Sequence, residues 1–166
     1  FLQATGTERC GTVPHGNYCP AYWVVISKNT NDSVAAYLVD SNGIDTVPVV
    51  TATNVTTGGG ARGNIVFSED YSKIGMSVEY RGMYVADFNN ITGETSNWVK
   101  IGNTTNGFGS AFSPDGTKVY YTSGYGQYLF QYNFLNTTQT QLGGPGLSYL
   151  ALGPDGKIYI SKYGQS

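Results

Sequence analysis

The chain contains the stretch Phe112-Ser113-Pro114-Asp115-Gly116-Thr117-Lys118-Val119-Tyr120, a tight turn followed by a short apolar segment. Related copies of the turn begin 45 residues earlier and 40 residues later, as Phe67-Ser68-Glu69-Asp70 and Leu152-Gly153-Pro154-Asp155-Gly156. Each copy leads into a Lys and a segment with apolar residues at alternate positions. A recurring unit of this length indicates a repeat architecture, and the Pro-Asp-Gly turns predict hairpins that join the first and second strands of each unit.

The segments after these hairpins complete a unit of four strands. A third strand is expected at residues 83–88 and 128–133, and a shorter, more polar fourth strand at 98–101 and 140–142. The opening of the chain has the same order with a weaker first turn, and no stretch shows a helical period. The sequence therefore predicts an all-β chain whose four-stranded antiparallel units are blades of a β-propeller.

About 3.5 blades are expected within a single domain over residues 1–166. Their predicted bounds are about 5–55, 60–103, 107–143 and 147–166, the last ending after its second strand. Because propellers close with four or more blades, we expect a partial propeller, an arc of a larger ring. The alternative is a smaller open sandwich of the same strands.

Composition restricts the possible partners and the setting. Charged residues make up only 12% of the chain and the net charge is −2, while Tyr occurs 14 times. The few cations are scattered, so no basic surface for nucleic acid is expected. No segment is apolar for long enough to span a membrane. The neutral hydroxyl and amide surface suits a secreted or cell-surface protein, and the start at Phe1 suggests a processed product or a piece of something longer.

A longer pattern, read in order, resembles a known group of proteins. It includes Val13-Pro14-His15-Gly16-Asn17, then Ser41-Asn42-Gly43-Ile44, Asp87-Phe88-Asn89 and the turn at residues 109–116. In this order the chain resembles the propeller region of large surface proteins of gliding Bacteroidetes-type bacteria, with YVTN-type or lactonase-like repeats. Two departures are Ile26-Ser27, where that group commonly has Thr-His, and the Glu69-Asp70-Tyr71 turn.

The resemblance implies an extracellular or outer-surface location, export by the type IX secretion route and a role in scaffolding, adhesion or gliding motility. It brings no catalytic residues and no cofactor. The main expectation is thus a non-catalytic, non-enzyme module that binds surface proteins or glycans as part of a longer chain or assembly. One alternative is a lactonase or hydrolase with a metal site in the channel, and another is a component of a secretion or motility complex.

Individual residues give few candidate sites. Cys10 and Cys19 could form a disulfide or remain free thiols, and the lone His15 is either a packed structural residue or a ligand. Asp87 lies within a strand, where its carboxylate either bonds neighbouring backbone or faces the channel. Several aromatic residues in or beside loops are candidate contacts for a sugar or protein partner: Tyr80, Tyr125, Tyr128 and Tyr163. Asp32-Ser33-Val34 and Asp45-Thr46-Val47 resemble bacterial O-glycosylation triplets, with Ser33 and Thr46 as acceptors. No catalytic, cofactor-binding or metal-binding residue is predicted.

Overall fold

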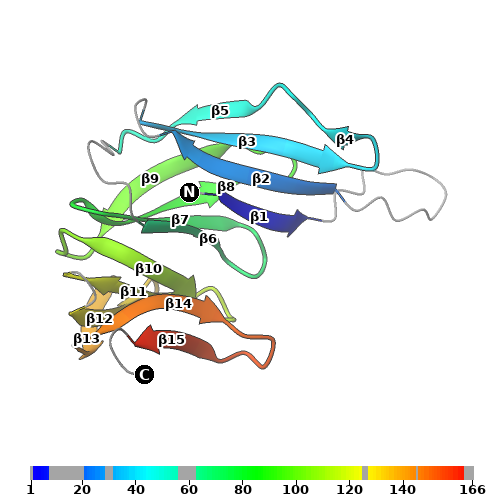
Figure 1. Ribbon diagram of the computed structural model, residues 1–166. Coiled ribbons are helices and arrows are strands. Elements are labelled where there is room, and N and C mark those ends of the chain that lie inside the picture. The colour runs from blue at the N-terminus through cyan, green and yellow to red at the C-terminus, as the bar shows by residue number, and fades with distance from the viewer. Residues whose placement is uncertain are drawn as a thin grey trace.

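A computed structural model describes residues 2–7, 21–28, 32–55, 63–124, 127–144 and 146–162. Within them the chain forms antiparallel sheets that follow one another in sequence and stack side by side (Figure 1). We number these sheets as blades 1 to 4. No helix in the described residues is long and apolar enough to cross a membrane.

Blades 2 and 3 each have four strands in sequential order. Blade 2 consists of β6 (Gly63–Phe67), β7 (Lys73–Val78), β8 (Gly82–Phe88) and β9 (Thr95–Ile101). Blade 3 consists of β10 (Gly107–Phe112), β11 (Lys118–Ser123), β12 (Tyr128–Asn133) and β13 (Thr138–Gly143). The predicted four-stranded antiparallel units, and with them the all-β propeller fold class, are confirmed.

Blades 1 and 4 depart from this plan. Blade 1 consists of β1 (Leu2–Thr7), β2 (Ala21–Lys28) and β3 (Ser33–Asp40), with β4 (Gly43–Ile44) and β5 (Val49–Ala52) both pairing with β3. β5 follows a loop in which Asp45 accepts a hydrogen bond from the Val47 amide. Blade 4 contains β14 (Leu147–Leu152) and β15 (Ile158–Lys162).

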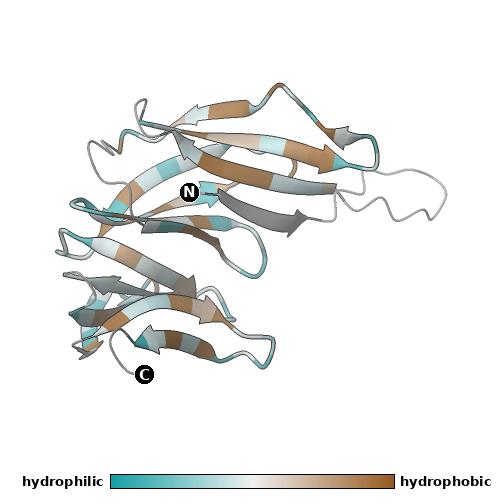
Figure 2. Cartoon of the chain, viewed as in Figure 1, coloured by the Kyte–Doolittle hydropathy of each residue, from teal (hydrophilic) through white to brown (hydrophobic). Residues whose placement is uncertain are grey.

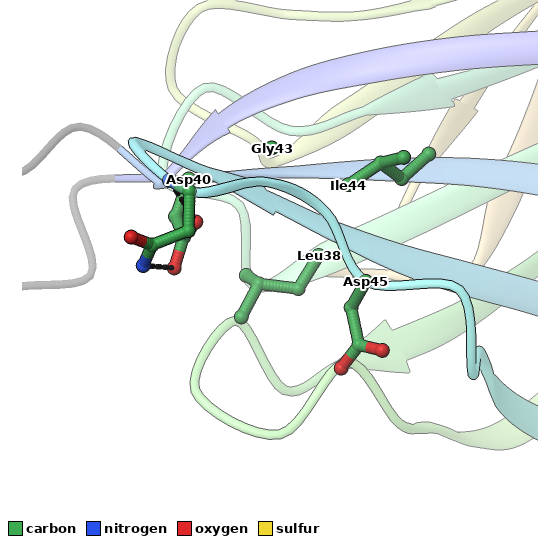
Figure 3. Close-up of a pocket in the computed structure, with 6 residues that line it drawn as sticks. Leu38, Asp40, Gly43, Ile44 and Asp45 are labelled. Carbon is green, nitrogen blue, oxygen red and sulfur yellow. Dashed lines mark hydrogen bonds between the residues drawn. The ribbon is translucent and has the colours of Figure 1, made fainter.

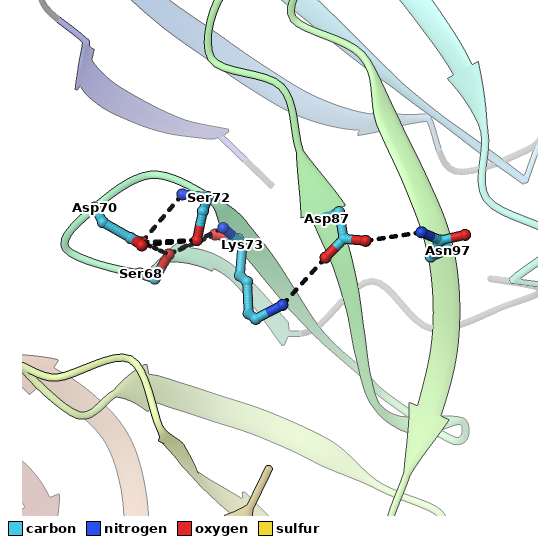
Figure 4. Close-up of polar contacts among 6 residues, drawn as sticks. All are labelled: Ser68, Asp70, Ser72, Lys73, Asp87 and Asn97. Carbon is cyan, nitrogen blue, oxygen red and sulfur yellow. Dashed lines mark hydrogen bonds and ion pairs between the residues drawn. The ribbon is translucent and has the colours of Figure 1, made fainter. Parts of the chain in front are cut away.

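The repeated turn closes the first hairpins of blades 2 and 3 by the same serine hydrogen bonds, and that of blade 4, where Gly153 replaces the serine, by backbone bonds without a serine hydroxyl. In blade 3 the Ser113 amide bonds the Lys118 carbonyl, the Ser113 hydroxyl bonds Asp115, and Gly116 takes a φ of 65°. In blade 2 the position of Gly116 is filled by Tyr71, which adopts a φ of 55° at a cost of about 1 kcal/mol. Asp70 accepts hydrogen bonds from the Ser68 and Ser72 hydroxyls (Figure 4), as Asp115 does from Ser113 and Thr117 in blade 3.

Apolar side chains pack between the blades rather than within one sheet. Figure 2 shows apolar residues concentrated along the strands and polar residues at the turns. Between blades 1 and 2, Trp23 and Val25 pack with Ile74 and Met76 in one buried cluster. Between blades 2 and 3, Met83 and the residues around it form a second cluster. Burial of each such side chain contributes about 1.5–3 kcal/mol, so these seams hold the blades in place.

Candidate functional site

The first strands of blades 2, 3 and 4 lie next to one another. β10 contacts both β6 and β14, so we call these three the inner strands. A hollow of about 320 Å³ lies over them, lined by Asn64, Val66, Phe67, Ser110, Ala111, Phe112, Leu150, Ala151 and Leu152. We call it the inner-strand pocket. Its volume is at the lower end of the range for small-molecule sites.

Asn64 is the main polar group of this pocket. Its Oδ1 accepts hydrogen bonds from the Ser77 hydroxyl at 2.6 Å and the Ser110 hydroxyl at 2.8 Å. Its Nδ2 donates to the Ser110 carbonyl at 3.1 Å. Because Asn64 is on β6 and Ser110 on β10, the amide joins the inner strands of blades 2 and 3.

Ser77 makes a second connection across the same seam. Its Oγ accepts a hydrogen bond from the backbone N–H of Asn64 at 3.1 Å and lies 2.7 Å from the main-chain carbonyl oxygen of Phe108. A hydroxyl has one proton, so Ser77 donates either to Asn64 Oδ1 or to the Phe108 carbonyl at a given moment. Ser77 and Ser110 are fully buried, so a serine hydroxyl that lost its acceptor would have neither a protein partner nor water to bond.

The seam between blades 3 and 4 repeats the hydroxyl bridge with a different neighbour. Thr122 Oγ1 accepts from the Gly109 amide at 3.1 Å and donates to the Ser148 carbonyl at 2.7 Å. Gly109 occupies the position of Asn64. A Cβ there would lie 2.6 Å from the Ser148 carbonyl oxygen and 2.6 Å from Tyr149 Cα, so only glycine permits this approach of β14.

The chemistry of the pocket lining is neutral. It combines one carboxamide and one hydroxyl with aliphatic and phenyl groups, and its nine residues include no titratable side chain. Such a lining suits an uncharged ligand with hydroxyl or carbonyl groups. Across the part of the chain that the structure describes, no three His, Cys, Asp or Glu side chains gather as metal ligands would.

A second, smaller hollow of about 190 Å³ lies at the β3–β4 turn and includes Asp40 and Asp45 (Figure 3). Asp40 Oδ1 accepts a hydrogen bond from the Asn42 amide at 2.7 Å, and Asp45 Oδ1 accepts one from the Val47 amide at 3.0 Å. Both carboxylates thus stabilise their own loop.

Two further carboxylates, Asp115 and Asp87, are held by hydrogen bonds within their own blades. Hydrogen bonds from Ser113 and Thr117 lower the pKa of Asp115 to about 2. The pKa of Asp87 is lowered mainly by a hydrogen bond from Asn97 Nδ2, and Lys73 adds an ion pair at 3.1 Å (Figure 4). Asp87 was expected to bond backbone or to face the channel. It instead bonds side chains on the two strands beside β8, away from the inner-strand pocket.

The predicted aromatic contacts are only in part described. Tyr80 is 51% and Tyr128 43% exposed, on different blades. The side-chain oxygen of Asn106 accepts a hydrogen bond from the Tyr80 backbone amide, and the main-chain carbonyl of Asn106 accepts one from the Gly124 backbone amide. The loops next to the two rings therefore lie at one rim. Neither ring lines the inner-strand pocket. Several predicted residues lie outside the described residues: Cys10, His15, Cys19, Tyr125 and Tyr163.

The two candidate glycosylation sites differ in exposure. Thr46 is exposed in the loop between β4 and β5, where an acceptor hydroxyl is accessible. Ser33 is only 7% exposed at the start of β3. A glycan on Ser33 would therefore have to displace packed neighbours in the folded blade.

Sequence reasoning did not find Asn64, Ser77, Ser110 or Thr122. The signal was present in the repeat, since the strand after each turn has a hydroxyl residue at an equivalent position, 77, 122 and 161. A hydroxyl at a fixed place in an apolar strand points to a hydrogen bond that the repeat reuses. Its partner on the next blade depends on register, which only the structure shows.

No protein-family model and no curated protein sequence matches the chain. Solved structures do resemble it. An auxiliary nutrient binding protein from Bacteroides thetaiotaomicron has a TM-score of 0.56 at 14% identity, with 84% of this chain and 33% of that chain covered. A 6-phosphogluconolactonase candidate from Bacteroides uniformis has a TM-score of 0.56 at 17% identity, with 84% of this chain and 47% of that chain covered.

A third structure, a gluconolactonase from Xanthomonas campestris, has a TM-score of 0.56 at 12% identity, covering 87% and 51%. At these identities the likeness shows a shared, propeller-like fold. This chain spans about half of the two lactonase-type structures and a third of the nutrient binding protein.

Proposed function

We propose that this chain forms the wall of a β-propeller pocket that binds a small, uncharged ligand rich in hydroxyl or carbonyl groups, such as a sugar lactone. The inner-strand pocket carries this proposal, because three repeats contribute to one hollow with a fixed carboxamide and hydroxyl at its base. Asn64 Oδ1 already accepts two hydrogen bonds and the Ser110 hydroxyl is fully buried, but Asn64 Nδ2 has a second N–H. This N–H can orient a ligand while the Val66 and Leu152 side chains cover its apolar faces.

Lactone hydrolysis is the second candidate function. It is supported by the gluconolactonase and the 6-phosphogluconolactonase candidate among the structures of the same fold. Fold alone does not determine chemistry, because one propeller scaffold hosts many activities. Hydrolysis needs a group that activates water, and the described lining supplies binding groups only.

Both candidates are tested on glucono-δ-lactone with a variant that fills the pocket. Leu152→Trp places an indole at an exposed lining position on the face of β14 that meets blade 3, and Leu142→Trp is the matched control at an exposed position on β13. We expect calorimetry to show binding to the parent chain and to Leu142→Trp, with at least tenfold weaker binding to Leu152→Trp. Lactone loss above the spontaneous rate, with and without added Ca²⁺ or Zn²⁺, would establish hydrolysis. Equal affinity of the two variants, or no binding by the parent at millimolar ligand, would contradict the pocket.

We also propose that the propeller belongs to a secreted or outer-surface protein that is exported by the type IX secretion route and has a scaffold or adhesion role. Support comes from the low charge content and from the ordered sequence pattern shared with surface proteins of gliding bacteria. Protease treatment of intact source cells tests this location, since a surface protein is cleaved while a cytosolic marker stays whole. An intact-mass increase that Thr46→Ala removes would identify the exposed threonine as the glycan acceptor.

A further inference from the structure

One face of the β14–β15 sheet has no neighbour among the described residues. Tyr149 is 49% and Tyr159 58% exposed there, and Ala151 and Ser161 are also exposed. This sheet lies at the end of the stack in Figure 1. We call these four residues the open face.

The open face carries the same hydroxyl as the two completed seams. Ser77, Thr122 and Ser161 occupy one position of the repeat, and each oxygen accepts a hydrogen bond from the first strand of its own blade, at 3.1, 3.1 and 3.0 Å. Ser77 and Thr122 also lie 2.7 Å from a carbonyl on the inner strand of the following blade. Within the described residues, the acceptor that the Ser161 hydroxyl has is the Tyr149 carbonyl of its own blade, at 3.4 Å.

Tyr159 shows the same contrast between a covered and an uncovered face. It corresponds to Tyr120, which is half-buried and packs on the cluster formed by Ala111, Leu129 and Leu150 at the seam with blade 4. A tyrosine at this position is therefore accommodated beneath a following blade. Its exposed counterpart presents the same apolar ring with nothing packed on it in the described part of the chain.

We propose that the open face seats a further blade of the same ring, whose inner strand accepts the Ser161 hydrogen bond on a main-chain carbonyl. The argument is continuity with two established seams, and it does not depend on what the pocket binds. Tyr149 replaces Asn64 and Gly109 at its repeat position, so the incoming strand has to leave room for a ring.

The test adds one blade by repeating the chain's own sequence. Thr122 and Ser161 are equivalent, so residues 124–162 are appended directly after Lys162 to supply two outer strands and the next first hairpin. Ser161→Ala is then compared in the 166-residue chain and in the extended chain, with Ser77→Ala as the matched variant at a completed seam.

We expect Ser77→Ala to lower Tm by about 3 °C in both chains. Ser161→Ala is expected to leave the Tm of the 166-residue chain unchanged. In the extended chain it should lower Tm by nearly as much as Ser77→Ala does. Hydrogen exchange of the β15 amides is expected to slow at least tenfold on extension. A second extended chain carrying Tyr149→Gly covers the case in which the ring itself blocks the added strand.

The proposal is overturned if β15 stays unprotected in both extended chains, or if Ser161→Ala remains silent in them. It is also overturned if light scattering shows the 166-residue chain to be a dimer that Tyr159→Arg dissociates, because the occupant would then be a second copy. Glycan-array binding abolished by Tyr159→Arg would instead assign the open face to a sugar.

Discussion

The seam between blades 2 and 3 and the seam between blades 3 and 4 share one hydrogen bond and differ in what surrounds it. Both use a hydroxyl that lies 2.7 Å from an inner-strand carbonyl of the following blade. The first seam adds the Asn64 side chain, whereas the second has Gly109 and relies on close backbone approach. The hydroxyl bridge is therefore the constant element, and the space beside it is filled either by an amide or by the neighbouring strand.

Gly109→Ala should have the largest effect on stability, because it adds a methyl group where β14 packs closely against β10 in the seam between blades 3 and 4. The new Cβ would lie 2.6 Å from two backbone atoms of β14, which cannot move as a side chain can. We expect the free energy of unfolding to fall by about 3 kcal/mol and the β14–β15 amides to lose exchange protection first. Gly143→Ala is the control, since its Cβ would meet nothing nearer than 3.7 Å. Equal, small effects would show that β14 does not lie against Gly109.

Asn64→Leu attacks the amide-filled seam instead. The change keeps the volume but leaves the buried Ser110 hydroxyl without its acceptor and the Ser110 carbonyl without its donor. Chemical denaturation should show a loss of about 2 kcal/mol. A stable Asn64→Leu chain would mean that the amide contributes nothing to the seam and is held only for a ligand.

Thr122→Val tests the hydroxyl bridge common to both seams. Valine matches the shape of threonine but leaves the Gly109 amide and the Ser148 carbonyl unpaired. The expected loss is about 1–2 kcal/mol, and Thr122→Ser should recover most of it. Failure of serine to recover stability would assign the effect to the methyl group rather than to the hydrogen bond.

Acid titration tests the turn of blade 3, and it should show the smallest effect on the free energy of unfolding. The pKa of Asp115 is lowered to about 2, so its contribution is complete above its ordinary value of 3.8 and is lost as pH falls from about 4 to 2. Ser113→Ala removes the largest cause of that shift, and carboxyl NMR should show the pKa of Asp115 rising. An unchanged pKa in that variant would show that Ser113 does not bond Asp115 in solution.

The repeat made the blades predictable from the sequence. Turns with Pro-Asp-Gly and alternating apolar residues specify hairpins locally, so β8, β9, β12 and β13 were placed to within a few residues. Blade 1 departs from the predicted four-stranded plan because β4 and β5 both pair with β3, and the loop between them is held by Asp45, which has no counterpart in the repeat.

The pocket could not be predicted in the same way. Asn64 and Ser110 lie 46 positions apart and meet only because β6 and β10 are neighbours in the ring. Asp87 illustrates the same difficulty, since its partners Lys73 and Asn97 come from the strands on either side. Side-chain pairs of this kind depend on register between strands rather than on any local pattern.

The most direct test of the ligand pocket is an NMR titration of the 166-residue chain with glucono-δ-lactone. Our account predicts saturable shifts confined to the Asn64 side-chain amide, the Leu150 methyls and the Ala151 signals on the inner strands. Shifts confined instead to the rim around Tyr80 and Tyr128, or no saturable shift at millimolar ligand, would contradict it.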